Sequence, residues 1–127
     1  MILADTSIWV DHLRDGDATM IAHLDAGLIL MHPFVVGELA MGNLPGRGGL
    51  LATLRKMPTV LKARDDEVLD LIERENLFGR GLGFVDTHLL ASALLTDEAT
   101  LWSRDHRLHA AAERLGVAAG VGARTRH

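Results

Sequence analysis

The chain opens with Met1-Ile2-Leu3-Ala4-Asp5-Thr6-Ser7-Ile8-Trp9, and this stretch indicates the fold class. A short apolar run with strand character leads into Asp5, and a helical pattern follows from Ser7 to Leu13. A strand that passes directly into a helix is typical of α/β proteins, whose strands pair in parallel. Asp5 would then lie at the carboxyl end of a strand, where ligand sites of open α/β sheets form.

Three further acidic residues occupy comparable positions. Glu38 lies in the helical stretch that follows a second apolar run, Asp86 lies near the start of a later helical stretch, and Asp105 follows the apolar Leu101-Trp102. In a parallel sheet, such positions meet at one edge. The sequence therefore predicts that four carboxylates, those of Asp5, Glu38, Asp86 and Asp105, converge.

The rest of the pattern predicts the element order β, α, α, β, α, α, α, α, β, α, which favours a parallel sheet covered by helices on both faces. We expect strands at Met1 to Ala4, at Leu28 to Met31 and around Leu101, with a further short strand at Thr59 to Leu61. The predicted fold is α/β, a three-layer α/β/α sandwich with a central parallel sheet of four to five strands. A chain of 127 residues is long enough for one domain, residues 1–127.

The amino-acid composition excludes some kinds of binding site. The chain has no cysteine, so it forms neither a disulfide framework nor a thiolate metal site, and only oxygen and imidazole ligands remain. Its net charge of -4 argues against nucleic-acid binding by a general positive field. Arg80, Arg104 and Arg107 flank two of the four acids in sequence and would supply positive charge locally.

The sequence also predicts where the protein acts. No basic segment precedes an apolar one at the N-terminus, so we expect no signal peptide. No apolar stretch approaches the roughly 20 residues that a membrane span requires. We therefore expect a cytoplasmic protein that does not associate with a membrane.

Helix capping is the main alternative explanation for the acids. Asp5 and Asp105 each precede a helical stretch and could serve as N-caps. Asp86, however, shares a helical face with Leu89 and Leu90 and so would point inward, where an unpaired carboxylate is costly. Glu38 lies similarly among apolar neighbours. One metal site explains all four acids more economically than four separate structural roles.

These residues resemble the PIN-domain ribonucleases, in particular the VapC-type toxins of bacterial toxin-antitoxin pairs. The resemblance covers nearly the whole chain and rests on four motifs in order: Asp5-Thr6-Ser7, Gly37-Glu38-Leu39, Val85-Asp86-x-x-Leu-Leu-Ala and Ser103-x-Asp105. It implies a metal-dependent endoribonuclease that hydrolyses RNA with metal-activated water and leaves a 5′-phosphate and a 3′-hydroxyl. It further implies a homodimer and a cognate antitoxin that inhibits the toxin by inserting a basic side chain among the carboxylates.

The resemblance also assigns roles within the site. Asp5 and Asp86 would bind Mg²⁺ directly, with Mn²⁺ as a substitute, and Glu38 and Asp105 would complete the catalytic metal site. Magnesium commonly takes only one or two protein carboxylates together with water. Ser7 and Ser103 would orient these groups through hydrogen bonds.

Other families fit less well. A haloacid-dehalogenase-like phosphatase requires a second aspartate two residues after the first, where this chain has Ser7, and a receiver-type signalling domain requires an adjacent acidic pair that is absent here. A non-catalytic binding module would tolerate the loss of one or more of the acids, yet all four are present.

Several other residues have weaker functional signals. His106 and His109 have the i, i+3 spacing of a metal-binding pair, but no third ligand is evident, so solvated or capping roles are favoured. Trp9 and Trp102 stand beside strand ends and are expected in the core. The glycine-rich loops from Gly42 to Gly49 and from Gly79 to Gly83 are hypothesised to select the RNA.

Overall fold

The computed structural model describes residues 1–121. Within them three short strands form a parallel sheet in the order β2-β1-β3: β1 (Ile2–Ala4), β2 (Ile29–Leu30) and β3 (Thr100–Trp102). The central strand β1 pairs Ile2 with Ile29 on one side and with Thr100 on the other. The parallel pairing makes all three strands end at the same edge.

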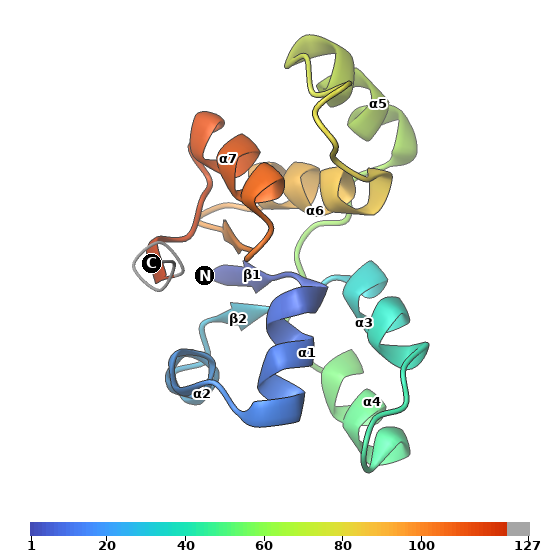
Figure 1. The fold of residues 1–127 in the computed structure, drawn as a ribbon, viewed down its shortest axis with the longest axis vertical. Helices are drawn as coiled ribbons and strands as arrows, with labels where there is room; N and C mark the ends of the chain where they lie inside the picture. Colours follow the sequence, from blue (N-terminus) through green and yellow to red (C-terminus); the bar gives the residue numbers. More distant parts are fainter. Residues whose placement is uncertain (122–127) are drawn as a thin grey trace.

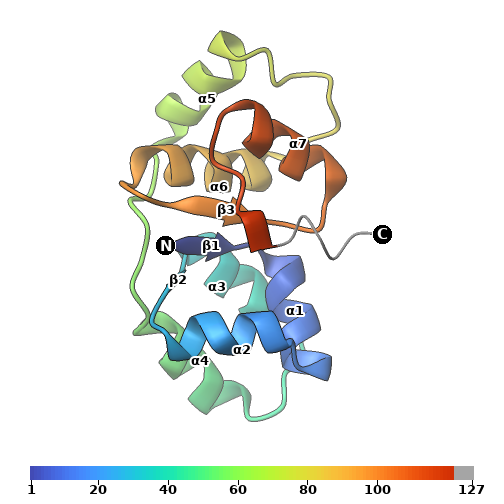
Figure 2. The same ribbon diagram turned by 90° about the vertical axis from the view of Figure 1, so that its left-hand side faces the viewer.

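Helices surround this small sheet (Figures 1 and 2). They are α1 (Thr6–Asp15), α2 (Ala18–Asp25), α3 (Pro33–Ala40), α4 (Arg47–Arg55), α5 (Asp65–Arg74), α6 (Phe84–Leu95) and α7 (His106–Arg114). In the figures α1 to α4 gather beside β2, and α5 to α7 gather beside β3. The order of strands and helices is the one that the sequence predicts, and the α/β class is confirmed.

The prediction of four to five strands is wrong. Two further segments approach the sheet edges, but each forms only an isolated parallel bridge, Met31 with Thr59 and Leu101 with Ala118. Pro58 has no N–H to donate, and Gly116 adopts a positive φ of 79° just before the second bridge. The predicted strand from Thr59 to Leu61 is thus reduced to a single bridge, and the sheet keeps three strands.

The core lies around β1 and α6. Leu3 and Leu90 are fully buried, and every residue from Thr87 to Ala93 is buried although only part of that run is apolar. The enclosed part of α6 begins one residue after Asp86, so the packed core sets where the first turn of the helix lies. Trp9 and Trp102 are both buried, which confirms their predicted place in the core.

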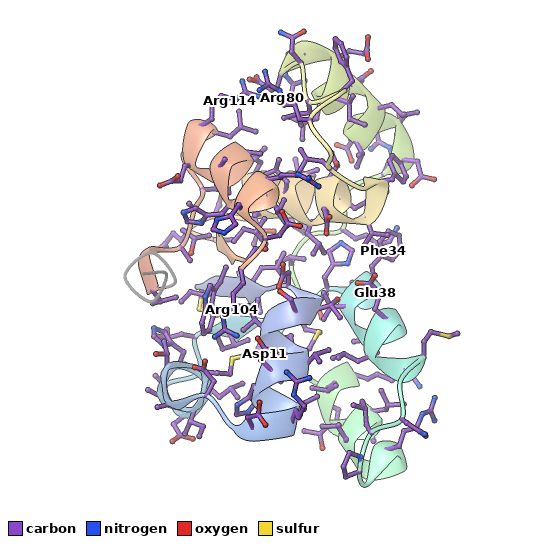
Figure 3. The ribbon with its side chains drawn as sticks, in the orientation of Figure 1. Asp11, Phe34, Glu38, Arg80, Arg104 and Arg114 are labelled. Carbon is purple, nitrogen blue, oxygen red and sulfur yellow. The ribbon has the colours of Figure 1, made fainter. Side chains whose placement is uncertain are left out.

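A partly buried ion cluster fixes the connection between β3 and α7. The guanidinium of Arg104 contacts the carboxylate of Asp11 on α1 (Figure 3). It also contacts the carboxylate of Asp17, the N-cap of α2, with 2.8 Å between Nη2 and Asp17 Oδ2. Burial raises the pKa of Asp17, but the hydrogen bonds from Met20 and Arg104 and the charge of Arg104 outweigh it and lower the pKa below 3.8. We therefore assign Arg104 a structural role in place of the predicted local charge beside the acids.

Replacing Arg104 with glutamine should lower the free energy of unfolding at pH 7 by about 1 to 2 kcal/mol, because two partly buried carboxylates lose their partner. A group with a lowered folded pKa stabilises the protein above its unfolded pKa, so the difference should shrink as the pH falls below 3.8. Urea unfolding across pH measures both effects. Arg74→Gln is the control, since Arg74 is exposed and its ion pair with Glu75 is long, at 3.8 Å, so its loss should change stability little. A difference that grows at acid pH would contradict the assignment.

Candidate active site

Asp5 lies where β1 ends. Its backbone N–H donates to the carbonyl of Trp102 on the neighbouring strand at 3.0 Å, so the sheet itself fixes the position of this residue. Asp5 Oδ1 accepts hydrogen bonds from Ser7 Oγ at 2.6 Å and from the N–H of Ile8 at 3.2 Å. The carboxylate therefore caps α1, as the alternative explanation expects, but through one oxygen only. Capping by Oδ1 is compatible with metal binding through Oδ2.

Asp105 repeats this arrangement after β3. Its Oδ1 accepts hydrogen bonds from the N–H groups of Arg107 at 2.8 Å and Leu108 at 3.2 Å, so it caps α7. Ser103, which is buried, does not donate to this carboxylate: its Oγ accepts from the N–H of Asp105 at 3.0 Å. Ser7 thus orients a carboxylate side chain, whereas Ser103 fixes the backbone that carries one.

Glu38 approaches the same region from α3. Its Oε1 accepts a hydrogen bond from the hydroxyl of Thr6, the residue after Asp5. Glu38 itself is exposed, and it lies on α3 one turn beyond Phe34 (Figure 3). The role of Thr6 was not predicted from the sequence, although Thr6 belongs to the Asp-Thr-Ser motif. Thr6 joins the fourth acid to the end of the central strand.

Asp86 is the residue at which the four acids meet. It lies in the first turn of α6, and its pKa is raised, first by partial burial and then by the negative charges of Asp105, Asp5 and Glu38, against a hydrogen bond from the backbone of Gly83. All three carboxylates are therefore near enough to act on it electrostatically. A Cβ on Gly83 would lie 3.5 Å from Asp86 Oδ2, so the end of this loop lies beside the carboxylate.

Helix ends offset part of the repulsion among these acids. Asp5 and Asp105 are the N-caps of α1 and α7, and Asp86 lies in the first turn of α6. The N-terminus of a helix carries a partial positive charge from its unpaired N–H groups. Three such ends converge where the carboxylates meet, so the acids are held together before any cation binds.

The donors fit a hard cation. Carboxylate oxygens suit Mg²⁺ or Mn²⁺, and magnesium binds through one or two carboxylates and retains several waters. Among residues 1–121, no three His, Asp or Glu side chains are arranged closely enough to form a metal cage by themselves. The cluster is therefore compatible with a cation held by a pair of carboxylates and water, with the remaining acids acting at longer range.

Two buried histidines brace the helices that carry these acids. His88 on α6 contacts the rings of Phe34 and Phe84, and its Nε2 lies 2.9 Å from Asp65 Oδ1 at the start of α5. His32 caps α3, since its Nδ1 accepts from the N–H of Phe34 at 2.9 Å. Burial, together with the charges of His88 and Lys62, lowers the pKa of His32 to about 4, so the ring is neutral and can accept this bond.

These histidine contacts were not predicted from the sequence. Neither His32 nor His88 has a partner that is recognisable from sequence spacing. The partners come from different helices, which sequence periodicity does not reveal. His109 is buried, not solvated, with Nε2 3.5 Å from Glu113 Oε2.

In the described part of the chain, no helix is both long and apolar enough to cross a membrane.

Comparison with known proteins identifies the family. No protein-family model matches the sequence. The chain is 47% identical over 121 residues to Ribonuclease VapC32 from two strains of Mycobacterium tuberculosis, CDC 1551 / Oshkosh and ATCC 25618 / H37Rv. The alignment covers 93% of this chain and 95% of the relative, so the similarity extends over nearly the whole length of both proteins. The chain belongs to the family of VapC-type PIN-domain ribonucleases.

Proposed function

We propose that this protein is a metal-dependent endoribonuclease and the toxin of a toxin-antitoxin pair. The observation that carries the proposal is the convergence of four carboxylates from separate elements on Asp86, whose pKa is raised by burial and by the other three charges. Concentrated negative charge at the carboxyl ends of parallel strands is useful to an enzyme that binds a divalent cation. The name of the relative, a ribonuclease, supports RNA as the substrate.

In this proposal Asp5 and Asp86 bind the cation, and Glu38 and Asp105 complete the catalytic site. When bound, Mg²⁺ or Mn²⁺ supplies positive charge that stabilises the phosphoryl oxygens and activates the attacking water. Ser7 holds the Asp5 carboxylate in one orientation through its hydrogen bond. Glu38 is the exposed member of the set and, held by Thr6, is suited to accept a proton from the attacking water.

We also propose the partners that the family implies. A cognate antitoxin would inhibit the enzyme by inserting a basic side chain among the carboxylates, where the charges are complementary. The active form would be a homodimer of single PIN domains in the cytoplasm. A small open reading frame beside the gene would support the antitoxin, and the mass of the purified protein in solution would test the dimer.

RNA selectivity is assigned to two glycine-rich loops, from Gly42 to Gly49 and from Gly79 to Gly83. The second loop covers Asp86, since Gly83 lies against its carboxylate. Exchanging each loop with that of a relative and mapping the cut sites tests this assignment. An unchanged cleavage profile would contradict it.

The direct test of the activity is to sequence RNA ends after expression of the wild type and of Asp5→Ala. New 5′-phosphate and 3′-hydroxyl ends should appear at defined positions with the wild type and be absent with the variant. RNA ends with a 5′-hydroxyl and a 3′-phosphate, or equal cleavage by the two proteins, would exclude the proposed reaction. Complete absence of cleavage by the wild type would favour a non-catalytic binding protein.

Replacing Asp86 with asparagine should reduce cleavage about 100-fold or more, the scale expected when a charge that stabilises the transition state is removed. The fold should stay intact and become equally or more stable at pH 7 without metal. A carboxyl whose folded pKa is raised costs stability above its unfolded pKa, and this cost vanishes below 3.8. Thermal melting across pH, with Asp25→Asn as the exposed control, measures the effect. A strongly unfolded Asp86→Asn protein would count against it.

Mg²⁺ or Mn²⁺ should raise the melting temperature of the wild type without RNA, by an amount equivalent to about 2.7 kcal/mol when the cation is present at about 100 times its Kd. Asp5→Asn should lose this response. Asparagine is as good an N-cap as aspartate, so α1 should keep its cap and the change reports on cation binding alone. Excess chelator should reverse the shift, and a monovalent salt of equal ionic strength should not produce it. An equal shift in both proteins would exclude Asp5 as a ligand.

A further inference from the structure

A second group of charged side chains lies beside the acids and has no part in the site described above. Three arginines and two alanines line a groove of about 290 Å³: Arg80, Arg107, Ala110, Ala111 and Arg114. We call it the arginine groove. Arg80 comes from the loop after α5, and the other residues come from α7. Arg80 and Arg107 also flank the acids in sequence, and Arg114 joins them in the structure.

The spacing on α7 explains the shape of the groove. Residues 107, 110, 111 and 114 follow the i, i+3, i+4, i+7 pattern of one helical face. The two alanines form a floor without long side chains, so the arginines at either end remain accessible. Arg107 and Arg114 are separated along the helix axis by roughly 10 Å, at about 1.5 Å per residue.

Two of the arginines are held in place by backbone carbonyls just after α5. Arg80 Nε donates to the carbonyl of Asn76 at 2.7 Å, and Arg114 Nη2 donates to the carbonyl of Glu75 at 2.7 Å. The two side chains come close together at the end of the molecule (Figure 3). Backbone carbonyls are neutral acceptors, so they orient the guanidinium groups without cancelling their charge. The carboxylate of Glu75, 3.7 Å from Arg114 Nη1, offsets part of one charge.

Arg107 connects the groove with the acids. Its backbone N–H donates to Asp105 Oδ1 at 2.8 Å, while its side chain passes over Gly81. A Cβ on Gly81 would lie 2.9 Å from Arg107 Cδ, and Gly81 has a φ of +79°, so glycine permits both the turn and the close approach. Within residues 1–121, no carboxylate forms an ion pair with Arg107. Its guanidinium is therefore available to a ligand.

The chemistry of the groove fits phosphate groups. Guanidinium groups bind phosphate oxygens through paired N–H donors, and they carry their charge at all relevant pH values. The alanine floor offers neither an aromatic ring for stacking nor a side-chain donor for a base edge. The groove would thus hold the backbone of a nucleic acid without reading its sequence.

We propose that the arginine groove binds phosphates of the RNA strand next to the one that is cut. This inference rests on the proposed ribonuclease function and adds a second binding surface to it. An acidic cluster in a protein of charge -4 repels RNA, so a nearby cationic surface is needed to hold the strand. The groove begins at Arg107, two residues from Asp105, and continues along α7, so a strand bound there enters the acid cluster directly.

The test measures binding of a single-stranded RNA oligonucleotide in the presence of excess chelator, so that metal-dependent cleavage does not occur, over a range of salt concentrations. The combined variant Arg80→Gln/Arg107→Gln/Arg114→Gln should lower the slope of log K against log salt by about two, because each phosphate that an arginine neutralises contributes about 0.7. Between about 50 and 200 mM salt, the affinity of the wild type should then fall about 20-fold more than that of the variant. The reduction should be similar for oligonucleotides of different sequence.

The matched control removes the same charge elsewhere. Arg14→Gln/Arg55→Gln/Lys56→Gln changes exposed residues of α1 and the end of α4, which lies away from α7 (Figure 1). It should leave the slope nearly unchanged. An equal reduction in both combined variants would overturn the proposal, because it would show a general field effect. The single variant Arg107→Gln tests the proposal even if the combined variant does not fold. Within residues 1–121 the Arg107 side chain forms no ion pair, so the variant should keep its fold and lower the slope by about 0.7.

Cleavage assays separate this inference from the proposed function. With a long RNA the groove variant should show a raised KM at similar kcat, and with a substrate too short to reach the groove it should match the wild type. Cleavage by the wild type together with an unchanged salt slope in the variant would overturn the groove and leave the ribonuclease proposal standing. A lowered slope without any cleavage by the wild type would support the groove and overturn the catalytic proposal.

Discussion

The parallel pairing of β1 with β3 is the constraint on which the rest of this structure depends. Each strand has only three residues. The hydrogen bond from the Asp5 N–H to the Trp102 carbonyl continues the parallel pairing to the residue at which β1 ends. Two acidic residues then follow neighbouring strands at one edge. Burial of α6 against β3 adds Asp86, and Thr6 adds Glu38. A small sheet therefore brings together, at one edge, acidic groups that are far apart in sequence.

Charge repulsion opposes this arrangement, and the fold offsets it locally. The three aspartates stand at the N-terminal ends of helices, so unpaired N–H groups face the carboxylates. Capping and catalysis therefore do not compete as explanations for Asp5 and Asp105: the same side chain ends a strand, begins a helix and leaves one oxygen for a ligand. Burial, and after it the residual repulsion from the other carboxylates, raises the pKa of Asp86.

The sequence predicted the order of the elements and the convergence of the acids because both follow from local patterns. Apolar runs mark strands, and an acid at the end of a parallel strand can lie at only one edge. The number of strands was overestimated, since an apolar segment does not reveal whether its partner allows more than one bridge. Long-range side-chain partners, such as Asp65 for His88 and Asp17 for Arg104, were not predictable from spacing. These interactions depend on tertiary packing, which periodicity does not encode.

Neighbouring residues in the connection from β3 to α7 have different roles. Ser103 holds the backbone of Asp105, Asp105 caps α7, and Arg107 in the first turn of α7 lines the groove, while Arg104 pairs with Asp11 on α1 and with Asp17. Inserting or deleting a single amino acid here would displace Arg104 from Asp11 and Asp17, or Asp105 from the N-terminus of α7. We therefore expect related chains to vary the composition of this segment more readily than its length.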